Sequence, residues 1–277
     1  MSAAQQLYPA AFDAVAERYD DTFTYSRIGQ AQRAAVWSEL KDLFHPGNRL
    51  LEIGCGTGVD ACFLAQRGIH VTACDSSSQM VAMTSRRVQQ NGLGRFVTPL
   101  VLPAEQLSHL HSNERFDGAF SNFGALNCVE NLDNLSSDLA ALIKPGGVAL
   151  LCLMSSFCAW ETAWYLAHAK TRKAFRRQQH DGVMARLADS AYVHVTYPTV
   201  SALAHAFAPE FKIKSIKGIG VTVPPSYLEP WAQRHPRLLQ LCERMDSVLS
   251  LCPGVRLLAD HVLVKLARVG TTARSTR

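Results

Sequence analysis

The residues best placed to do chemistry lie in one glycine-rich segment, residues 50–60, with the sequence LLEIGCGTGVD. An apolar stretch leads straight into the glycines, and a helical pattern follows them. Glycine permits positive φ angles and lets a ligand approach the backbone closely. The first N–H groups of a helix are unpaired and carry a partial positive charge, which suits a carboxylate or a phosphate. The segment therefore predicts a binding site for a small anionic ligand at a strand–helix turn.

The spacing of these glycines separates two classes of nucleotide ligand. Counted from Gly54, the third glycine of the dinucleotide motif G-x-G-x-x-G would fall on Val59. Counted from Gly56, the relaxed motif fits with Ala61, but it then begins two residues beyond the strand end. Glu52 has no obvious use beside a pyrophosphate, whereas its carboxylate suits a ligand that carries an ammonium group. An NAD-dependent oxidoreductase is therefore the less favoured alternative.

The pattern E-x-G-x-G-x-G after an apolar strand resembles the first motif of class I methyltransferases that depend on S-adenosylmethionine (SAM). The resemblance covers residues 12–154 and weakens afterwards. It implies SAM as the cofactor and transfer of a methyl group to an O, N or C atom of a small-molecule acceptor by in-line displacement. A methyltransferase-like protein that binds SAM without catalysis is the other interpretation that the motif leaves open.

The resemblance assigns further positions to the cofactor. Asp75 ends the second predicted strand and would accept hydrogen bonds from the ribose hydroxyls. Asp75 and Glu105 have another possible role, because an acidic side chain is also favoured at a helix N-terminus. Met80 could equally be an ordinary core residue. The cofactor set that we predict is Tyr19, Glu52, Gly54, Cys55, Gly56, Gly58, Asp75, Ser76, Met80, Ala104, Glu105, Asn122 and Phe123.

The acceptor side is less defined. The sequence Ser-Asn-Phe-Gly at residues 121–124 departs from the Asn-or-Asp-Pro-Pro-aromatic tetrad of methyltransferases that modify nucleic-acid amino groups, which argues against such an acceptor. The predicted acceptor-binding residues are Asn127, Trp160, Tyr197 and Tyr227. No catalytic residue is assigned. Glu161 and His194 are candidates for a general base, His205 and His261 are further histidines, and no spacing singles out one of them.

Alternating strands and helices must position these residues. Apolar runs predict strands at 49–53, 69–74, 96–101, 116–121, 148–154, 211–216 and 262–266, and an added strand at 192–197. Helices are predicted at 59–67, 77–90, 132–143, 157–189, 199–207 and 227–251. Strands that are apolar on both faces predict a parallel sheet covered on both sides. Right-handed crossovers then predict an α/β fold with a doubly wound, mostly parallel seven-stranded sheet of the Rossmann-like type, with helical insertions after strands five and six.

The expected domain organisation follows from these elements. Residues 1–45 should form an N-terminal helical lid segment, with two helices in residues 8–44 around a polar turn at 20–26. Residues 46–270 should form the methyltransferase domain, with 155–198 and 218–258 as substrate-cap insertions. Residues 271–277 should be a disordered tail.

Composition narrows the class of partner. The net charge is +5, but the charge is scattered, and the densest basic stretch, residues 170–177, reads as the solvated face of a helix, so we expect no nucleic-acid partner. The eight cysteines form no C-x-x-C pair and no zinc spacing, which predicts reduced thiols and no metal site. With no signal pattern and no apolar run near about 20 residues, we expect a soluble, cytoplasmic protein without a membrane span. The oligomeric state is not predicted.

Overall fold

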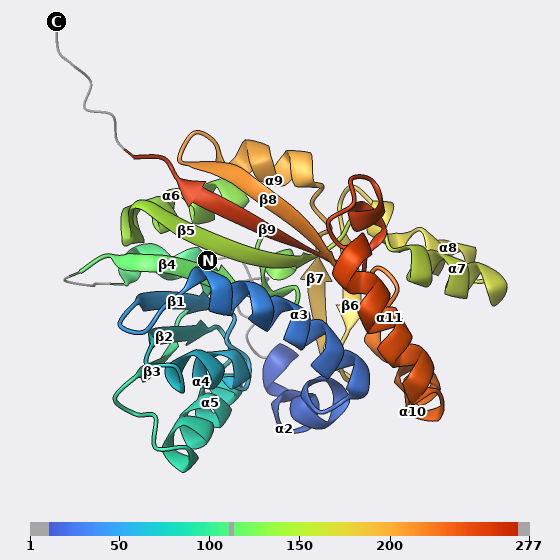
Figure 1. Cartoon of the computed structure of the whole chain (residues 1–277), viewed down its shortest axis with the longest axis horizontal. Coiled ribbons are helices and arrows are strands. Elements are labelled where there is room, and N and C mark those ends of the chain that lie inside the picture. Colours follow the sequence, from blue (N-terminus) through green and yellow to red (C-terminus); the bar gives the residue numbers. More distant parts are fainter. Residues whose placement is uncertain (1–10, 111–113, 271–277) are drawn as a thin grey trace, which may run out of the picture.

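The computed structural model describes residues 11–110 and 114–270 of the chain. Its centre is a seven-stranded sheet with the strand order β3-β2-β1-β4-β5-β9-β8 (Figure 1). Strands β1 to β5 pair in parallel, whereas β9 runs antiparallel to both β5 and β8. The strands are β1 (Arg49–Ile53), β2 (His70–Asp75), β3 (Val97–Val101), β4 (Phe116–Ser121), β5 (Ile143–Met154), β8 (Phe211–Ile219) and β9 (His261–Arg268). The predicted doubly wound, mostly parallel sheet is confirmed.

Two hydrophobic cores form because successive side chains of each buried strand point to opposite faces. Leu50 belongs to the core under α3, α4 and α5, whereas Leu51 belongs to the core under α6 and α9. The same alternation separates Leu150 from Leu151 in β5. The helices on these faces are α3 (Arg27–Leu43), α4 (Val59–Ala65), α5 (Ser78–Gln90), α6 (Leu132–Leu142) and α9 (Val200–Phe207).

Polar caps explain why several predicted helix boundaries match the structure closely. The Ser77 hydroxyl accepts a hydrogen bond from the Met80 amide at the start of α5, and the Thr199 hydroxyl accepts one from the Ala202 amide at the start of α9. Two short 3-10 helices, η2 (Ala104–His109) and η3 (Ala125–Cys128), follow β3 and β4. They carry the loops that lie at the carboxyl ends of the parallel strands, here called the carboxyl edge.

The segment between β5 and β8 differs from the prediction. Helix α7 (Ala159–Ala167), the short α8 (Thr171–Ala174) and the 3-10 helix η4 (Arg176–Gln178) occupy only part of the stretch predicted as helical. Strand β6 (Val183–Arg186) follows, and β7 (Tyr192–Val195) pairs with β6 in a separate ribbon instead of joining the main sheet. Gly182, at φ 71°, separates helical from extended backbone, and β6 depends on pairing with a later strand, which helical periodicity does not reveal.

The N-terminal segment also differs. The short helix α2 (Ala16–Tyr19) continues into a π-helical turn, η1 (Asp20–Thr24), where a polar turn was predicted. The Tyr25 amide donates to the Asp20 carbonyl at 2.8 Å, which closes the wider ring, and Ser26 then caps α3. The first part of the predicted lid segment, residues 1–10, and the predicted tail, residues 271–277, lie outside the described residues.

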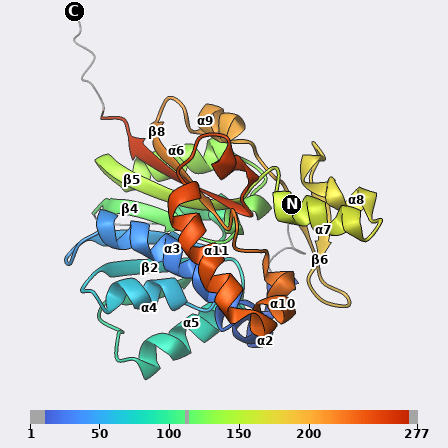
Figure 2. The same cartoon turned by 45° about the vertical axis from the view of Figure 1, so that its right-hand side comes forward.

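Both expected insertions lie at one end of the sheet, as Figures 1 and 2 show. The second insertion contains the 3-10 helix η5 (Ser226–Leu228), α10 (Glu229–Arg234), α11 (Pro236–Leu249) and η6 (Val255–Leu258). One apolar cluster joins it to Ile28 of α3 and Trp160 of α7. Another joins the β6–β7 ribbon to Ala11 and Met154. None of the helices within the described residues is long and apolar enough to cross a membrane.

Candidate active site

The glycine-rich segment forms the turn between β1 and α4. Gly54, Gly56 and Gly58 have φ angles of 72°, 53° and 77°, which side chains with a Cβ atom adopt rarely. A Cβ on Gly54 would lie 2.2 Å from the Ala125 Cβ, so the turn is packed there. At Gly56 the nearest atom to such a Cβ is Tyr19 Cε1, 4.0 Å away. The backbone at Gly56 therefore faces open space beneath the Tyr19 ring, where a ligand has room to approach.

Glu52 lies at the end of β1, immediately below this turn. Its side chain is only 2% exposed, and Oε2 has no hydrogen-bond partner among the described residues. Burial raises the pKa of the Glu52 carboxyl well above its ordinary value, the Asp60 carboxylate raises it further, and the Arg33 guanidinium opposes both. A buried, unpartnered carboxyl is unfavourable unless a donor or cation meets it.

A buried polar cluster adjoins Glu52. Asp60 Oδ1 accepts hydrogen bonds from Arg33 Nη1 and from Trp37 Nε1, both at 2.6 Å, and Asp60 Oδ2 accepts one from Asn122 Nδ2 at 2.9 Å. Both oxygens of Asp60 therefore have partners within the protein. Asn122 Oδ1 and Arg33 Nε, by contrast, are buried and have no partner among the described residues. The cluster retains one unused acceptor and one unused donor beside the unused oxygen of Glu52.

Arg33 and Asp60 were missed from the sequence. Arg33 occupies the same face of α3 as the buried residues Val36 and Leu40, where a charged residue is out of pattern. Asp60 comes two residues after the last glycine of the turn. A charge within an apolar stripe and an acid directly after the glycines are the signals that point to this pair.

Asp75 lies at the end of β2, next to the glycine turn. Its Oδ2 accepts a hydrogen bond from the Gly56 amide at 2.8 Å, and its Oδ1 accepts one from the Ser77 amide at 2.9 Å. Burial raises the pKa of Asp75, and backbone N–H groups, including that of Ser76, oppose the shift. Each carboxylate oxygen has a further lone pair to offer. The N-cap of α5 is Ser77 and not Asp75.

The N-terminal segment is fastened to the glycine turn through Asp20. Asp20 Oδ1 accepts a hydrogen bond from Thr57 Oγ1 at 2.6 Å, and Asp20 Oδ2 forms an ion pair with Arg87. Arg87 Nε also donates to the Thr57 carbonyl at 2.8 Å. These contacts hold the neighbouring Tyr19 over Gly56. Burial raises the pKa of Tyr19 to about 12, with the Arg33 guanidinium opposing the shift, so its phenol stays neutral at physiological pH.

Cys128 lies near two of the predicted cofactor residues, Glu105 and Asp75. Burial raises the pKa of the Cys128 thiol to about 12, and the carboxylates of Glu105 and Asp75 raise it further. Both acids therefore lie near the same thiol. Glu105 is exposed and Ala104 half-buried at the start of η2. Met80 is 2% exposed in the first turn of α5.

Cys55 is placed differently from the other predicted cofactor residues. Its thiol is buried in the core under α3, α4 and α5, and its Sγ lies 3.6 Å from Thr84 Oγ1. The amides of Gly54 and Cys55 both donate to the Cys74 carbonyl, at 2.8 and 2.9 Å. Cys55 can therefore offer a ligand only backbone atoms.

Phe123 follows β4 with a φ angle of 52°, which is unfavourable for a bulky residue. Such strain costs about 1–3 kcal/mol and clusters at functional sites. The Phe123 ring lies 5.1 Å from that of Phe23, 4.9 Å from the Arg33 guanidinium carbon and 5.8 Å from the His261 ring. Phe123 therefore joins the polar cluster to the start of β9.

The predicted acceptor residues have other partners. Asn127 is fully buried, and its amide bonds to the backbone of Met154 and Thr196, so its side chain anchors the β6–β7 ribbon to β5. Trp160 Nε1 donates to the Thr222 carbonyl at 3.0 Å.

The two predicted acceptor tyrosines lie on the insertions. The Tyr197 ring lies 5.6 Å from the Arg177 guanidinium carbon, and Tyr227, 38% exposed, lies 5.9 Å from the Tyr165 ring. Burial raises the pKa of Tyr227, and the Glu161 carboxylate raises it further.

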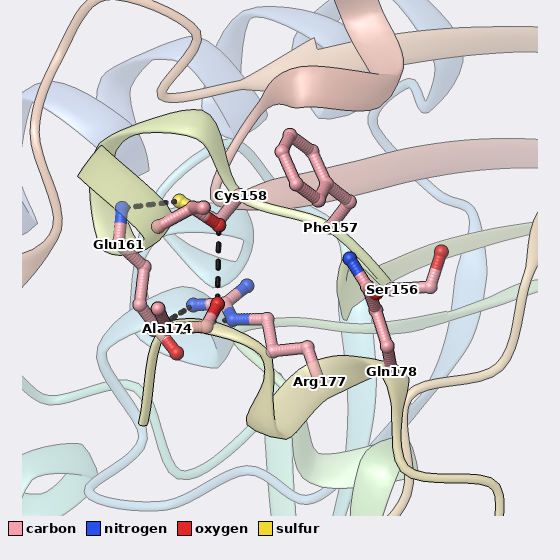
Figure 3. Close-up of a pocket in the computed structure, with 8 residues that line it drawn as sticks. Ser156, Phe157, Cys158, Glu161, Ala174, Arg177 and Gln178 are labelled. Carbon is pink, nitrogen blue, oxygen red and sulfur yellow. Dashed lines mark hydrogen bonds and ion pairs between the residues drawn. The ribbon is translucent and has the colours of Figure 1, made fainter. Parts of the chain in front are cut away.

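The two candidate bases are both engaged in structural contacts. Glu161 is 1% exposed and accepts hydrogen bonds from both Arg176 and Arg177, beside a small hollow after β5 (Figure 3). Arg177 is itself buried and Arg176 is half-buried, whereas Lys170, Arg172 and Lys173 are exposed, so only the first part of the basic stretch is the solvated face that the sequence predicted. His194 Nε2 lies 2.6 Å from the Asp181 carbonyl oxygen. Neither side chain is placed as a free base.

Comparisons with known proteins agree with this geometry. Residues 50–147 match the family described as "Methyltransferase domain". The demethylmenaquinone methyltransferase of Clavibacter sepedonicus is 31% identical over 147 residues, which are 53% of this chain and 58% of that protein. The chain thus spans little more than half the length of this relative. The demethylmenaquinone methyltransferase of Mycobacterium bovis is 30% identical over 200 residues, or 70% of this chain and 79% of that protein.

A solved structure shows the same fold. The CcbJ methyltransferase from Streptomyces caelestis superposes with a TM-score of 0.60 over 94% of this chain and 98% of that chain, at 14% identity. Sheet order, glycine turn and sequence relatives lead to one conclusion. The chain belongs to the family of class I SAM-dependent methyltransferases.

Proposed function

We propose that the chain catalyses SAM-dependent methyl transfer to a small-molecule acceptor. The observation that carries the proposal is a group of three buried polar atoms in the cluster beside the glycine turn that have no hydrogen-bond partner among the described residues: Glu52 Oε2, Asn122 Oδ1 and Arg33 Nε. The two acceptors could bind the ammonium of an amino acid, and the cationic donor could bind its carboxylate. Such a pair of groups on a nucleoside is a feature of SAM, and NAD lacks it.

The other predicted residues suit the nucleoside part of SAM. Asp75 would accept hydrogen bonds from the ribose hydroxyls, and Met80, Ala104 and Glu105 would border the adenine. Tyr19 would cover the ligand, since it stands over Gly56 and leaves room there. The bound cofactor supplies an electrophilic methyl group on a sulfonium.

The chain's own task is then to orient the acceptor and to exclude water. Alignment of reacting groups can contribute about 7–11 kcal/mol at best. The N-terminal segment and the two insertions are suited to this task, because one apolar cluster packs Ile28 against the second insertion and another packs Ala11 against the first. We propose residues 11–45 as the described part of the lid segment, and 155–198 and 218–258 as the cap over the acceptor.

The acceptor that we propose is a flat, largely apolar molecule. The rings of Phe23, Phe123 and His261 form a continuous row beside the polar cluster, with centroids 5.1 and 5.8 Å apart. The relatives named demethylmenaquinone methyltransferases support an acceptor with a conjugated ring, since that is the kind of molecule in their names. The missing Pro-Pro tetrad speaks against a nucleic-acid acceptor.

Calorimetric titration with SAM, S-adenosylhomocysteine, NAD and NADP tests the proposal first. We expect saturable binding of both adenosyl compounds and no response to the dinucleotides. Transfer of a labelled methyl group from SAM to a panel of conjugated-ring acceptors tests turnover next. Dinucleotide binding alone would contradict the proposed cofactor, whereas SAM binding without transfer to any acceptor would favour a protein that binds SAM without catalysis.

A further inference from the structure

We propose that His261, held in position by Asp260, is the general base of the transfer, and that the acceptor carries a weakly acidic hydroxyl on its conjugated ring. This inference rests on the proposed methyltransferase function. It goes further by naming the residue that removes the proton and the chemical class of the atom that receives the methyl group.

The topology brings His261 to the site. Strand β9 is antiparallel to its neighbours, so its first residue, His261, lies at the carboxyl edge, where its register partner is Met154, the last residue of β5. Ligands of open α/β sheets bind at this edge. Ser121, which ends β4, pairs with Leu151, three residues before Met154. His261 therefore extends beyond the end of β4, toward the loop that carries Phe123.

The side-chain contacts join His261 to the cofactor side of the site. Its ring meets the Phe123 ring nearly perpendicularly, at 86° and 5.8 Å between centroids. The same Phe123 ring lies under the Arg33 guanidinium. One aromatic ring thus separates His261 from the polar cluster that we assign to the amino-acid part of SAM. The strained φ of Phe123 is what turns its ring into this position.

Asp260 is fixed so that it faces one nitrogen of the imidazole. Its Oδ1 accepts a hydrogen bond from Arg177 Nη2 at 2.7 Å, and its Oδ2 accepts one from Gln32 Nε2 at 3.2 Å. Oδ2 also lies 3.4 Å from His261 Nδ1, a buried atom that makes no hydrogen bond within the described residues. That separation is long for a hydrogen bond, and such catalytic contacts often shorten when ligands bind.

The carboxylate selects the tautomer of His261. A proton on Nδ1 faces Asp260, so the lone pair remains on Nε2. No hydrogen bond joins Nε2 to another residue in the described parts of the chain, and 8% of the side chain is exposed. This is the arrangement of a base whose acceptor atom is available to a ligand.

The surrounding charges are balanced. Besides Asp260, the groups that face this pair are Arg177, which also bonds to Glu161, and Arg33, across the Phe123 ring. Arg33 is paired with Asp60, and Arg177 is paired with two carboxylates. His261 therefore has one charged group in direct contact, Asp260, which lies on the Nδ1 side of its ring.

The chemistry of the step requires such a base only for certain acceptors. A hydroxyl oxygen forms the new bond to the methyl carbon while the bond between methyl carbon and sulfur breaks, and the electron pair of that bond stays on sulfur. The hydroxyl proton passes to His261 Nε2 and then to water. A thioether acceptor has no proton to lose, and an amine can lose its proton to water after transfer. A ring carbon also loses a proton on methylation, but it becomes nucleophilic enough only when a hydroxyl on the same ring is deprotonated. The placed imidazole therefore indicates an acceptor with a hydroxyl on a conjugated ring.

The test compares His261→Gln with His45→Gln, a control at an exposed position before β1. The probe acceptor is a dihydroxynaphthalene, with the corresponding aminonaphthalene beside it. General bases contribute about 100- to 10,000-fold. We expect kcat with dihydroxynaphthalene to fall at least about 100-fold in His261→Gln, with KM and the Kd for S-adenosylhomocysteine changed less than about threefold and the rise of kcat with pH near neutrality lost.

A readout without turnover accompanies the kinetics. Nitrogen-15 spectra of the histidines, with His261 assigned from the variant, should show the proton of neutral His261 on Nδ1, and Asp260→Asn should change that tautomer ratio. His261→Gln with wild-type kcat, a proton on Nε2, or methylation of the aminonaphthalene but not of the dihydroxynaphthalene would overturn the inference. A wild-type protein that binds no S-adenosylhomocysteine would overturn the proposed function instead. Binding without methylation of either probe would overturn the acceptor class.

Discussion

Replacing Glu52 by Gln should stabilise the protein while it weakens cofactor binding. The Glu52 carboxyl is buried, its Oε2 lacks a partner among the described residues, and burial, with Asp60, raises its pKa. A folded protein that must ionise such a group near neutral pH loses stability. The Gln amide occupies nearly the same volume without the charge, so the variant removes the cost of ionisation and keeps the packing.

The size of the effect follows from the pKa difference between folded and unfolded chains. Each unit by which the folded-state pKa exceeds the unfolded value costs about 1.4 kcal/mol, and with an unfolded value near 4.3 the cost at pH 7 cannot exceed about 4 kcal/mol. We expect a gain of about 1–3 kcal/mol in the free energy of unfolding, because the Gln amide also needs partners. That corresponds to a rise in Tm of about 3–10 °C for a chain of this size.

The pH dependence identifies the cause. Because the folded-state pKa of Glu52 is raised, the penalty is absent below the unfolded pKa and grows as the pH rises toward the folded one. Urea denaturation of wild type and Glu52→Gln should therefore differ most at pH 8 and converge as the pH approaches 4. An equal difference at pH 5 and pH 8, or a variant less stable than wild type at pH 8, would refute the reasoning.

Asp60→Asn is the matched control. Asp60 is also a buried carboxylate, but it accepts hydrogen bonds from Arg33, Trp37 and Asn122. Its replacement leaves the Arg33 guanidinium buried and unpaired, so we expect the free energy of unfolding to fall by about 3–5 kcal/mol instead of rising.

The effect of Glu52→Gln on cofactor binding is measured by calorimetry. We expect the affinity for S-adenosylhomocysteine to fall roughly 10- to 150-fold, because the variant loses a charge-assisted hydrogen bond of about 1.5–3 kcal/mol.

Three further predictions concern packing and charge. Arg177→Ala should lower the free energy of unfolding by about 3–5 kcal/mol because two buried carboxylates lose the cation that they share. Arg176→Ala, at a side chain that is 34% exposed, should lower it by about 1 kcal/mol, and equal losses in urea denaturation would contradict the central role of Arg177. Gly54→Ala should lower Tm strongly because its Cβ would collide with Ala125, whereas Gly56→Ala should fold and lose affinity for S-adenosylhomocysteine; unchanged affinity would show that no ligand approaches Gly56. Burial opposes ionisation of Asp260, but His261 and Arg177 outweigh it and lower its pKa, so its contribution to stability is present above the unfolded pKa near 3.9 and lost as the pH falls further. Urea denaturation between pH 6 and pH 3 should then show a steeper loss for wild type than for Asp260→Asn, and parallel curves would contradict the assignment.

The elements around the glycine turn could be predicted because their signals are local. Apolar runs, the glycines after Ile53 and the caps at Ser77 and Thr199 each act within a few residues, so β1, α5 and α9 begin close to their expected positions. The same reasoning placed Glu52 and Asp75 at one sheet edge, since parallel neighbouring strands end side by side. Local pattern and topology agree over this half of the chain.

The remaining features depend on residues far apart in the sequence. Glu161 comes a few residues after β5 and so looked like an available base, but η4 brings Arg177 back against it. His261 looked like any other histidine until the antiparallel β9 paired it with Met154. Strand β6 exists because β7 pairs with it, and no period within Val183–Arg186 reveals that partner.

Some buried polar groups of this protein have hydrogen-bond partners and others have none, and this difference distinguishes groups that stabilise the fold from groups that we propose to bind a ligand. Asp60 and Glu161 are each paired with a buried arginine. Replacing either carboxylate by an apolar side chain would leave that arginine without its ion-pair partner and would destabilise the fold. Glu52 Oε2, Asn122 Oδ1 and Arg33 Nε have no hydrogen-bond partner among the described residues. They belong to the cluster beside the glycine turn, where, in the part of the chain that the structure describes, only Tyr19 lies within 4 Å of the Cβ position of Gly56. Burying polar atoms without partners lowers stability, and the free chain gains nothing from it. We infer that a ligand completes the hydrogen bonds of these three atoms, and a ligand that carries both an ammonium and a carboxylate would match two acceptors and one donor.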